Sequence, residues 1–110
     1  MEAAVSRLLD AMLSQNALSE SRIVSIVFSQ TRDLVGENPA RALRRSDGGA
    51  RFAATPLFCT QEPEYPDSLP RIVRVLLTFE REEGGEATPV YLDGAELLRP
   101  DLAGADLTEE

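Results

Sequence analysis

Several side-chain types that enzymes commonly use are missing from this chain of 110 residues. It has no histidine, which excludes the Ser-His-Asp and Cys-His arrangements of nucleophilic catalysis and every His-ligated metal site. It also has no lysine, so Schiff-base chemistry and P-loop phosphate binding are excluded. Any active site must therefore use arginine, carboxylates, tyrosine, serine, threonine and backbone groups.

Cysteine, positive charge and long apolar runs are also scarce. The single cysteine, Cys59, allows no internal disulfide and no cysteine-rich zinc site, and it favours a cytoplasmic location. The net charge of −8 argues against nonspecific binding to nucleic acid or anionic membranes, which needs a basic face. The most apolar run, residues 23–28, is too short to span a bilayer, and the first residues do not resemble a signal peptide. We therefore expect no nucleic-acid or membrane partner, no metal and no cofactor.

The pattern of apolar and polar residues predicts an α+β domain. Helices are predicted over residues 2–16 and 39–45, and strands over residues 22–30, 54–62, 71–81 and 89–99. The short helix begins at Asn38-Pro39, because asparagine caps free amides and proline fits the first helical turn. A mixed sheet of about four strands with one long and one short helix leaves one sheet face poorly covered, which favours oligomerisation. We expect one domain over residues 1–103 and an acidic tail over 104–110.

The position of a residue in a predicted strand is not enough to identify it as catalytic or ligand-binding. Arg74 lies in mid-strand among apolar neighbours, where it must reach water or pair with a carboxylate. Glu62 precedes a proline at a strand end, where a solvated carboxylate is ordinary. Cys59 lies in an apolar strand and Tyr91 near a strand start, where a small buried thiol and a half-buried aromatic are common. These patterns alone predict a soluble α+β domain with an arginine-lined surface.

Four segments carry a resemblance to a known family. They are residues 29–34 (SQTRDL), 38–44 (NPARALR), 56–62 (PLFCTQE) with 72–78 (IVRVLLT), and 90–102 (VYLDGAELLRPDL). Together they make residues 3–103 similar to the trimeric, mixed α/β class of bacterial chorismate mutases, and the last two segments are the most specific. The resemblance implies a trimeric pseudo-α/β-barrel with binding sites between subunits and a dianionic, chorismate-like substrate.

The reaction of that family fits the missing residue types. Chorismate rearranges to prephenate within one molecule, without proton transfer, a nucleophile or a metal. The enzyme has to hold a dianion in a chair-like conformer and stabilise the charge that separates across the breaking C–O bond. Arginines and one carboxylate can do this without histidine or lysine.

The resemblance also implies a role for each matching residue. Arg74 would contact the ether oxygen and a substrate carboxylate, and Glu62 would face the ring hydroxyl and the developing positive charge. Cys59 would line the ring pocket near that hydroxyl, and Tyr91 would contact a substrate carboxylate. The other implied binding residues are Arg41, which replaces a family lysine, Arg44 and Arg99 at the mouth, and Leu57 and Phe58 in the pocket wall.

The chain departs from the family pattern at two points. It begins at the first helix, without the preceding strand and its arginine clamp, and Asn38 stands where the family usually has an aromatic residue. Losing one such clamp costs about 2–4 kcal/mol, or roughly 30- to 1000-fold in rate, so we expect weakened activity. Because Cys59 and Glu62 are three residues apart on a strand, a shared pocket requires a bend or the strand's end near residues 60–62, which Pro63 favours.

Three functional hypotheses follow. The first is a chorismate mutase. The second is a diverged family member that acts on or binds a related ligand in a specialised pathway, with weak or no mutase activity. The third is a non-enzymatic interaction protein. Glu62, Arg74 and Tyr91 favour the first.

Overall fold

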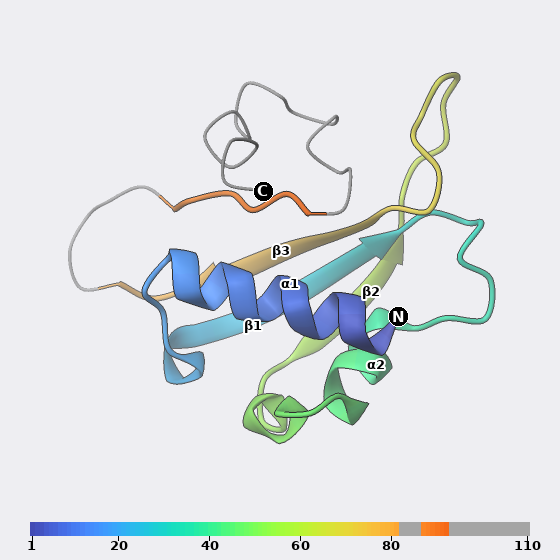
Figure 1. Ribbon diagram of the computed structural model, residues 1–110. Helices are drawn as coiled ribbons and strands as arrows, with labels where there is room; N and C mark the ends of the chain where they lie inside the picture. Colours follow the sequence, from blue (N-terminus) through green and yellow to red (C-terminus); the bar gives the residue numbers. More distant parts are fainter. Residues whose placement is uncertain (82–86, 93–110) are drawn as a thin grey trace.

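The computed structural model describes residues 1–81 and 87–92. Its helices are α1 (Glu2–Gln15) and α2 (Pro39–Arg45), with short 3-10 helices η1 (Glu20–Arg22) and η2 (Gly49–Phe52). Its strands are β1 (Ile23–Gln30), β2 (Leu57–Gln61) and β3 (Val73–Phe79). The helix α1 runs along one face of the sheet, with α2 near its N-terminal end (Figure 1). Within the described ranges, no helix has the length and hydropathy to span a bilayer.

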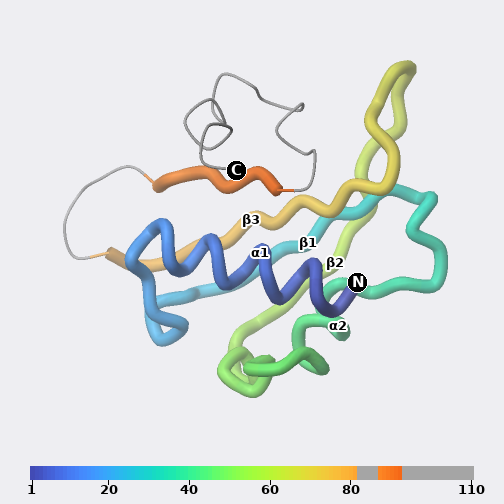
Figure 2. Tube along the Cα trace, viewed as in Figure 1, coloured from blue at the N-terminus to red at the C-terminus, as the bar shows by residue number. Residues whose placement is uncertain are grey.

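The sheet places β1 in the middle, in the order β2-β1-β3. The strand β1 runs parallel to β2 and antiparallel to β3, so the sheet is mixed. The chain reaches β2 from β1 through α2 and η2, and it reaches β3 through a long loop that extends beyond the sheet (Figure 2). The predicted α+β class, with one long and one short helix, is confirmed.

The sheet has three strands within the described residues, one fewer than predicted. Residues 87–92 form no strand. Instead, the segment is attached to the end of α1, where the Asn16 side chain accepts a hydrogen bond from Thr88 N (2.6 Å) and donates one to Thr88 O (3.1 Å). Pro89 follows without an N–H group, so it cannot donate to a ladder. The rest of the predicted strand 89–99 and the tail 104–110 lie outside the described residues.

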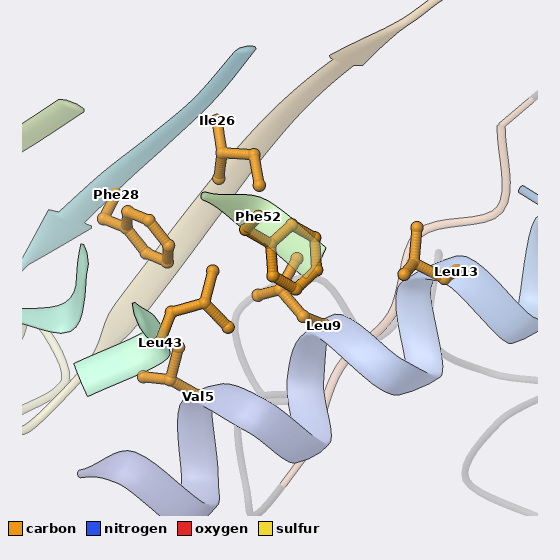
Figure 3. Close-up of a cluster of buried hydrophobic side chains, with 7 residues drawn as sticks. All are labelled: Val5, Leu9, Leu13, Ile26, Phe28, Leu43 and Phe52. Carbon is orange, nitrogen blue, oxygen red and sulfur yellow. The ribbon is translucent and has the colours of Figure 1, made fainter. Parts of the chain in front are cut away.

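The core lies between α1 and one face of the sheet. The helix contributes one residue per turn to it, because residues four apart share a helical face. Figure 3 shows these side chains pointing toward those of β1, α2 and η2; the cluster comprises Val5, Leu9, Leu13, Ile26, Phe28, Leu43 and Phe52. Burying each of these side chains stabilises the fold by about 1.5–3 kcal/mol.

Neither helix of the described residues covers the opposite sheet face. We call it the open face; its side chains form two rows across the strands, Phe58, Val27 and Leu76, then Thr60, Ser29 and Arg74. Phe58 is 74% exposed and Leu76 is 67% exposed. Both helices pack on the other face of the sheet. Along β3, Val73, Val75 and Leu77 pack against the core, whereas Arg74 and Leu76 lie between them on the open face.

The short helix α2 begins as its sequence predicts. The Oδ1 atom of Asn38 accepts a hydrogen bond from Arg41 N at 3.0 Å, and Pro39 occupies the first turn. After α2 the chain turns back tightly, and a Cβ atom on Gly49 would lie only 2.2 Å from Leu43 O. This turn holds Asn38 and α2 beside the end of β2.

Candidate active site

Arg74 and Glu62, the two residues predicted to be catalytic, lie together on the open face. Arg74 projects from the middle of β3, and its Nε donates to Glu62 Oε2 at 2.9 Å. Glu62 follows β2 directly, and its backbone N–H donates to Gln30 O at 2.8 Å, which continues the parallel ladder by one residue. The Arg74 side chain is 61% exposed, whereas that of Glu62 is 13% exposed. The pair therefore presents its guanidinium to solvent while the carboxylate is sheltered.

Glu62 is held in its ionised form. Burial raises the pKa of this carboxyl, but a hydrogen bond from the Ser29 side chain and the ion pair with Arg74 outweigh that effect, so the pKa lies below its ordinary value. The carboxylate therefore carries its negative charge throughout the neutral pH range. A fixed anion beside an exposed cation can orient a ligand that carries both a hydroxyl group and carboxylates.

A groove of about 690 Å³ runs beside Arg74. It lies between β3, α1 and residues 89–92, and Tyr91 is half-buried in its wall. Ser29 and Thr60 line it from the sheet, and Arg74 lines it from β3. The structure thus brings Arg74 and Tyr91 to one concave surface, although they lie in separate segments of the sequence.

Cys59 lies on the other side of the sheet. Its register partner is Phe28, whose side chain is in the core, and its Sγ donates to Asn38 Oδ1 at 3.5 Å. Of the two predicted alternatives, the strand's end near residues 60–62 is confirmed, because β2 ends at Gln61. The strand does not bend before that point, because the ladder continues regularly to Glu62. Side chains three apart on a regular strand point to opposite faces. Cys59 and Asn38 therefore line a second, smaller groove, together with the loop that follows β1.

The two predicted pocket-wall residues separate in the same way. Leu57 packs against the core, on the same face as Cys59, whereas Phe58 lies on the open face. Consecutive residues of a strand point to opposite faces, so a single subunit cannot place both in one pocket.

The three predicted peripheral arginines have different positions. Arg44 binds the backbone, since its guanidinium donates to the carbonyl oxygens of Phe52, Ala53 and Thr55, each at 3.1 Å. Arg41 is exposed on α2, next to the Asn38 cap. Arg99 lies outside the described residues. Arg44 therefore joins α2 to the segment that leads into β2.

Sequence reasoning did not single out Ser29 or Thr60. Both share one row of the open face with Arg74, and both line the larger groove. Ser29 begins the first segment of the family resemblance, which is the signal that could have drawn attention to it. Its proximity to Glu62 depends on strand register, which the sequence does not state.

The grooves contain cations, carboxylates and hydroxyl groups. In the part of the chain that the structure describes, no group of three metal-binding side chains is close enough to hold an ion. An arrangement of this kind binds and orients an anionic ligand, and it stabilises separated charge through fixed groups.

Comparison with known proteins identifies the family. The family model described as chorismate mutase type I matches residues 1–102. The chain is 30% identical over 104 residues to chorismate mutase AroH of Bacillus subtilis, covering 94% of this chain and 80% of that protein. It is 35% identical over 104 residues to chorismate mutase AroH of Thermus thermophilus, covering 93% of this chain and 82% of that protein.

A solved structure agrees with this assignment. The chorismate mutase of Clostridium thermocellum superposes with a TM-score of 0.75 at 34% sequence identity, covering 86% of this chain and 82% of that one. The family model and the relatives thus match nearly the whole chain. This protein belongs to the chorismate mutase type I family.

Proposed function

We propose that this protein is a chorismate mutase, an isomerase that converts chorismate to prephenate, and that Arg74 and Glu62 are its catalytic residues. The observation that carries the proposal is the Arg74–Glu62 pair, joined at 2.9 Å beside the groove that Tyr91 lines, in a chain of this family. The reaction needs binding, orientation and charge stabilisation, which are what this arrangement provides.

Arg74 has the donors that the reaction requires. The contact with Glu62 uses only its Nε, and a guanidinium has five N–H donors in a fixed planar fork. The two terminal amino groups of Arg74 bind the ether oxygen and a carboxylate of chorismate. As the C–O bond breaks, negative charge develops on that oxygen, and the guanidinium stabilises it more strongly than it stabilises the ground state.

Glu62 supplies the opposite charge. Its lowered pKa keeps it ionised at neutral pH, so it accepts a hydrogen bond from the ring hydroxyl and faces the positive charge that develops on the ring. Tyr91, in the groove wall, donates to a substrate carboxylate. No proton changes hands in these steps, so neither residue acts as a general acid or base.

The same proposal makes the protein a homotrimer with its sites between subunits. Cys59 with Asn38 and Arg74 with Glu62 lie on opposite faces of one sheet, so one chain cannot present both sets to one ligand. Two different surfaces that meet across a subunit contact make a heterologous interface, which forms a ring when its rotation closes after three subunits. In the ring, Cys59, Leu57, Arg41 and Arg44 of one subunit complete the groove of the next.

The exposed apolar side chains of the open face support this assembly. Phe58 and Leu76 are adjacent to the row that contains Arg74, and exposed apolar patches of this kind mark interfaces. The residues predicted in the site but outside the described ranges, chiefly Arg99, belong to the proposal on the resemblance alone. Cys59 is an exposed free thiol, which suits the reducing cytoplasm.

A direct assay tests the activity. The purified chain is incubated with chorismate, and both chorismate loss and prephenate formation are followed. We expect stoichiometric conversion that Arg74→Ala reduces strongly. A folded wild-type protein that gives no conversion above the uncatalysed rate would refute the proposal.

Light scattering tests the assembly. We expect a trimer, and we expect Phe58→Asp to dissociate it and to abolish activity. Tyr65→Asp is the control, because Tyr65 is 59% exposed on the loop between β2 and β3 rather than on the open face. A wild-type protein that stays monomeric at micromolar concentration would contradict the shared site.

A further inference from the structure

Ser29 occupies the centre of the Arg74 row on the open face. It lies in β1, the middle strand, where its register partners are Thr60 on β2 and Arg74 on β3. Its side chain is half-buried and lines the larger groove. A residue of the central strand is held on both sides by ladder hydrogen bonds, so its hydroxyl group has a well-defined position.

The Glu62 carboxylate comes back over this row from the end of β2. Glu62 N donates to the carbonyl oxygen of Gln30, so the ladder continues regularly from Thr60 to Glu62. Since residues two apart on a strand share a face, the Glu62 side chain lies on the same face as Thr60 and its partner Ser29. Arg74 Nε on β3 donates to Glu62 Oε2 at 2.9 Å, and the Ser29 hydroxyl, which lies on the same face in β1, lowers the pKa of this carboxyl as a second donor. Donors from two separate strands restrict the place and the rotation of a carboxylate more than one donor does.

We propose that Ser29 is a positioning residue, whose hydroxyl group holds the Glu62 carboxylate in one orientation toward the groove while Arg74 binds the ligand. The inference rests on the proposed mutase function and extends it to a residue with no charge. Arg74 is mostly exposed, and its terminal amino groups bind the substrate while its Nε contacts Glu62. Ser29 lies in the central strand and supports the carboxylate from the sheet side.

The ionisation of Glu62 then depends on Ser29 in a measurable way. In the described part of the chain, the charged group that faces Glu62 is Arg74 from β3, while β1 and β2 contribute the Ser29 and Thr60 hydroxyl groups. Removing the Ser29 hydroxyl leaves the burial of Glu62 unchanged and removes one donor, so the carboxyl group becomes easier to protonate.

The experiment compares Ser29→Ala with Ser29→Thr and with Ser25→Ala. Threonine keeps the hydroxyl and suits a central strand, so it tests rescue. Ser25 is the matched control, because it is a half-buried serine of the same strand that pairs with Thr78 on β3, away from Glu62. Each variant is measured for kcat, KM, the pH dependence of kcat/KM and Tm.

We expect Ser29→Ala to lower kcat about tenfold, the scale of one hydrogen bond to a charged group. Its KM changes little, and the acidic limb of its kcat/KM profile moves to higher pH. Ser29→Thr restores both values, and Ser25→Ala matches the wild type. A Ser29→Ala variant with wild-type kcat and an unmoved acidic limb would overturn the inference. So would a loss of activity that follows only a loss of Tm with an unchanged pH profile.

A second readout separates this inference from the proposed function. The Glu62 side-chain carboxyl is titrated by carbon NMR in the wild type and in Ser29→Ala, without substrate. A higher pKa in the variant supports the positioning contact even if the wild type does not rearrange chorismate, in which case only the proposed function fails. An active wild type with the same Glu62 pKa in both proteins would refute the positioning role alone.

Discussion

The two faces of the sheet differ although they share the same three strands. On one face, Ile26 and Phe28 are completely buried under α1. On the other face, Phe58 and Leu76 are mostly exposed beside Arg74 and Glu62. One face therefore holds the fold together within a single chain, whereas the other carries the charged groups and leaves apolar surface for another molecule.

This difference explains why the proposed catalytic residues lie on the open face. A carboxylate beneath α1 would lose its hydration and become protonated or unpaired. On the open face, Glu62 keeps its charge because Ser29 and Arg74 reach it from neighbouring strands. A second subunit that covers this face would exclude water from the groove and strengthen these interactions, since fixed charges act more strongly in a low-dielectric site.

The largest expected effect is a loss of folding stability when a side chain of the core face is truncated. Phe28→Ala removes a completely buried ring and should lower the free energy of unfolding by about 3–5 kcal/mol. Phe58→Ala truncates the same residue type on the open face. We expect it to weaken subunit association, so that its unfolding midpoint depends more strongly on protein concentration than the wild-type midpoint does. Urea unfolding at several protein concentrations measures both.

The concentration series is also the control for this pair. Phe28→Ala should be destabilised by the same free energy at every concentration at which the assembly is maintained. Equal losses from Phe28→Ala and Phe58→Ala, independent of concentration, would contradict the division between a core face and an interface face.

The second effect concerns catalysis on the open face. Arg74→Ala should lower kcat/KM by at least about 100-fold, the scale of one preorganised electrostatic donor. The loss should appear in kcat more than in KM, because the charge that Arg74 stabilises exists mainly in the transition state. Arg74→Lys should recover little, since a point charge cannot span an ether oxygen and a carboxylate as a planar fork does. Steady-state kinetics with prephenate detection measures these values.

Thermal stability of the same samples is the control. The Arg74 side chain is 61% exposed, and exposed ion pairs contribute at most about 1 kcal/mol, so Arg74→Ala should fold normally. A folded Arg74→Ala protein with near-normal turnover would eliminate the proposed mechanism.

Much of the fold is predictable from the sequence, for local reasons. The spacing of apolar residues in α1, the Asn38 cap and the alternation along β3 are properties of single segments, and the structure contains all of them. Residues 89–92 illustrate the limit. Their apolar character suits a strand, but the preceding Thr88 is bonded to Asn16, a contact between residues 72 positions apart.

The site is predictable only in part. Arg74 and Glu62 are marked by the family resemblance, and the structure brings them together. The separation of Cys59 from Glu62 follows from the regular continuation of the β1–β2 ladder, which a proline after Glu62 does not reveal. The contact between Ser29 and Glu62 requires the register of β1 and β2, which depends on packing over the whole sheet rather than on either segment.

A smaller effect on stability tests whether Arg44 stabilises the fold rather than binding a ligand. Its guanidinium donates to three backbone carbonyls, so Arg44→Gln should lower the free energy of unfolding by about 1–2 kcal/mol, as hydrogen bonds from a charged group are lost. Arg45→Gln is the matched control, because Arg45 is exposed and is the next residue of α2. We expect it to change stability by less than about 0.5 kcal/mol. Urea unfolding measures both, and equal stability of the two variants would contradict a structural role for Arg44.

The smallest effect concerns acid stability at the end of the sheet. Asp33 accepts hydrogen bonds from the Thr31 hydroxyl and from Arg71 N, where the chain enters β3. The hydrogen bond from Thr31 is the largest influence on this carboxyl, and with the contribution of Arg71 it holds the pKa below the ordinary value of 3.8. A lowered folded-state pKa means that the stabilisation is present above about pH 4 and is lost as the pH falls through the folded-state pKa.

Asp33→Asn should therefore flatten the decline in the urea midpoint below pH 4 while leaving the pH dependence of kcat/KM unchanged. Ser29→Ala should shift the kinetic profile instead, through Glu62. If Asp33→Asn moved the kinetic profile as Ser29→Ala does, the loop that follows β1 would act on the open face, and the separation of the two regions would not hold.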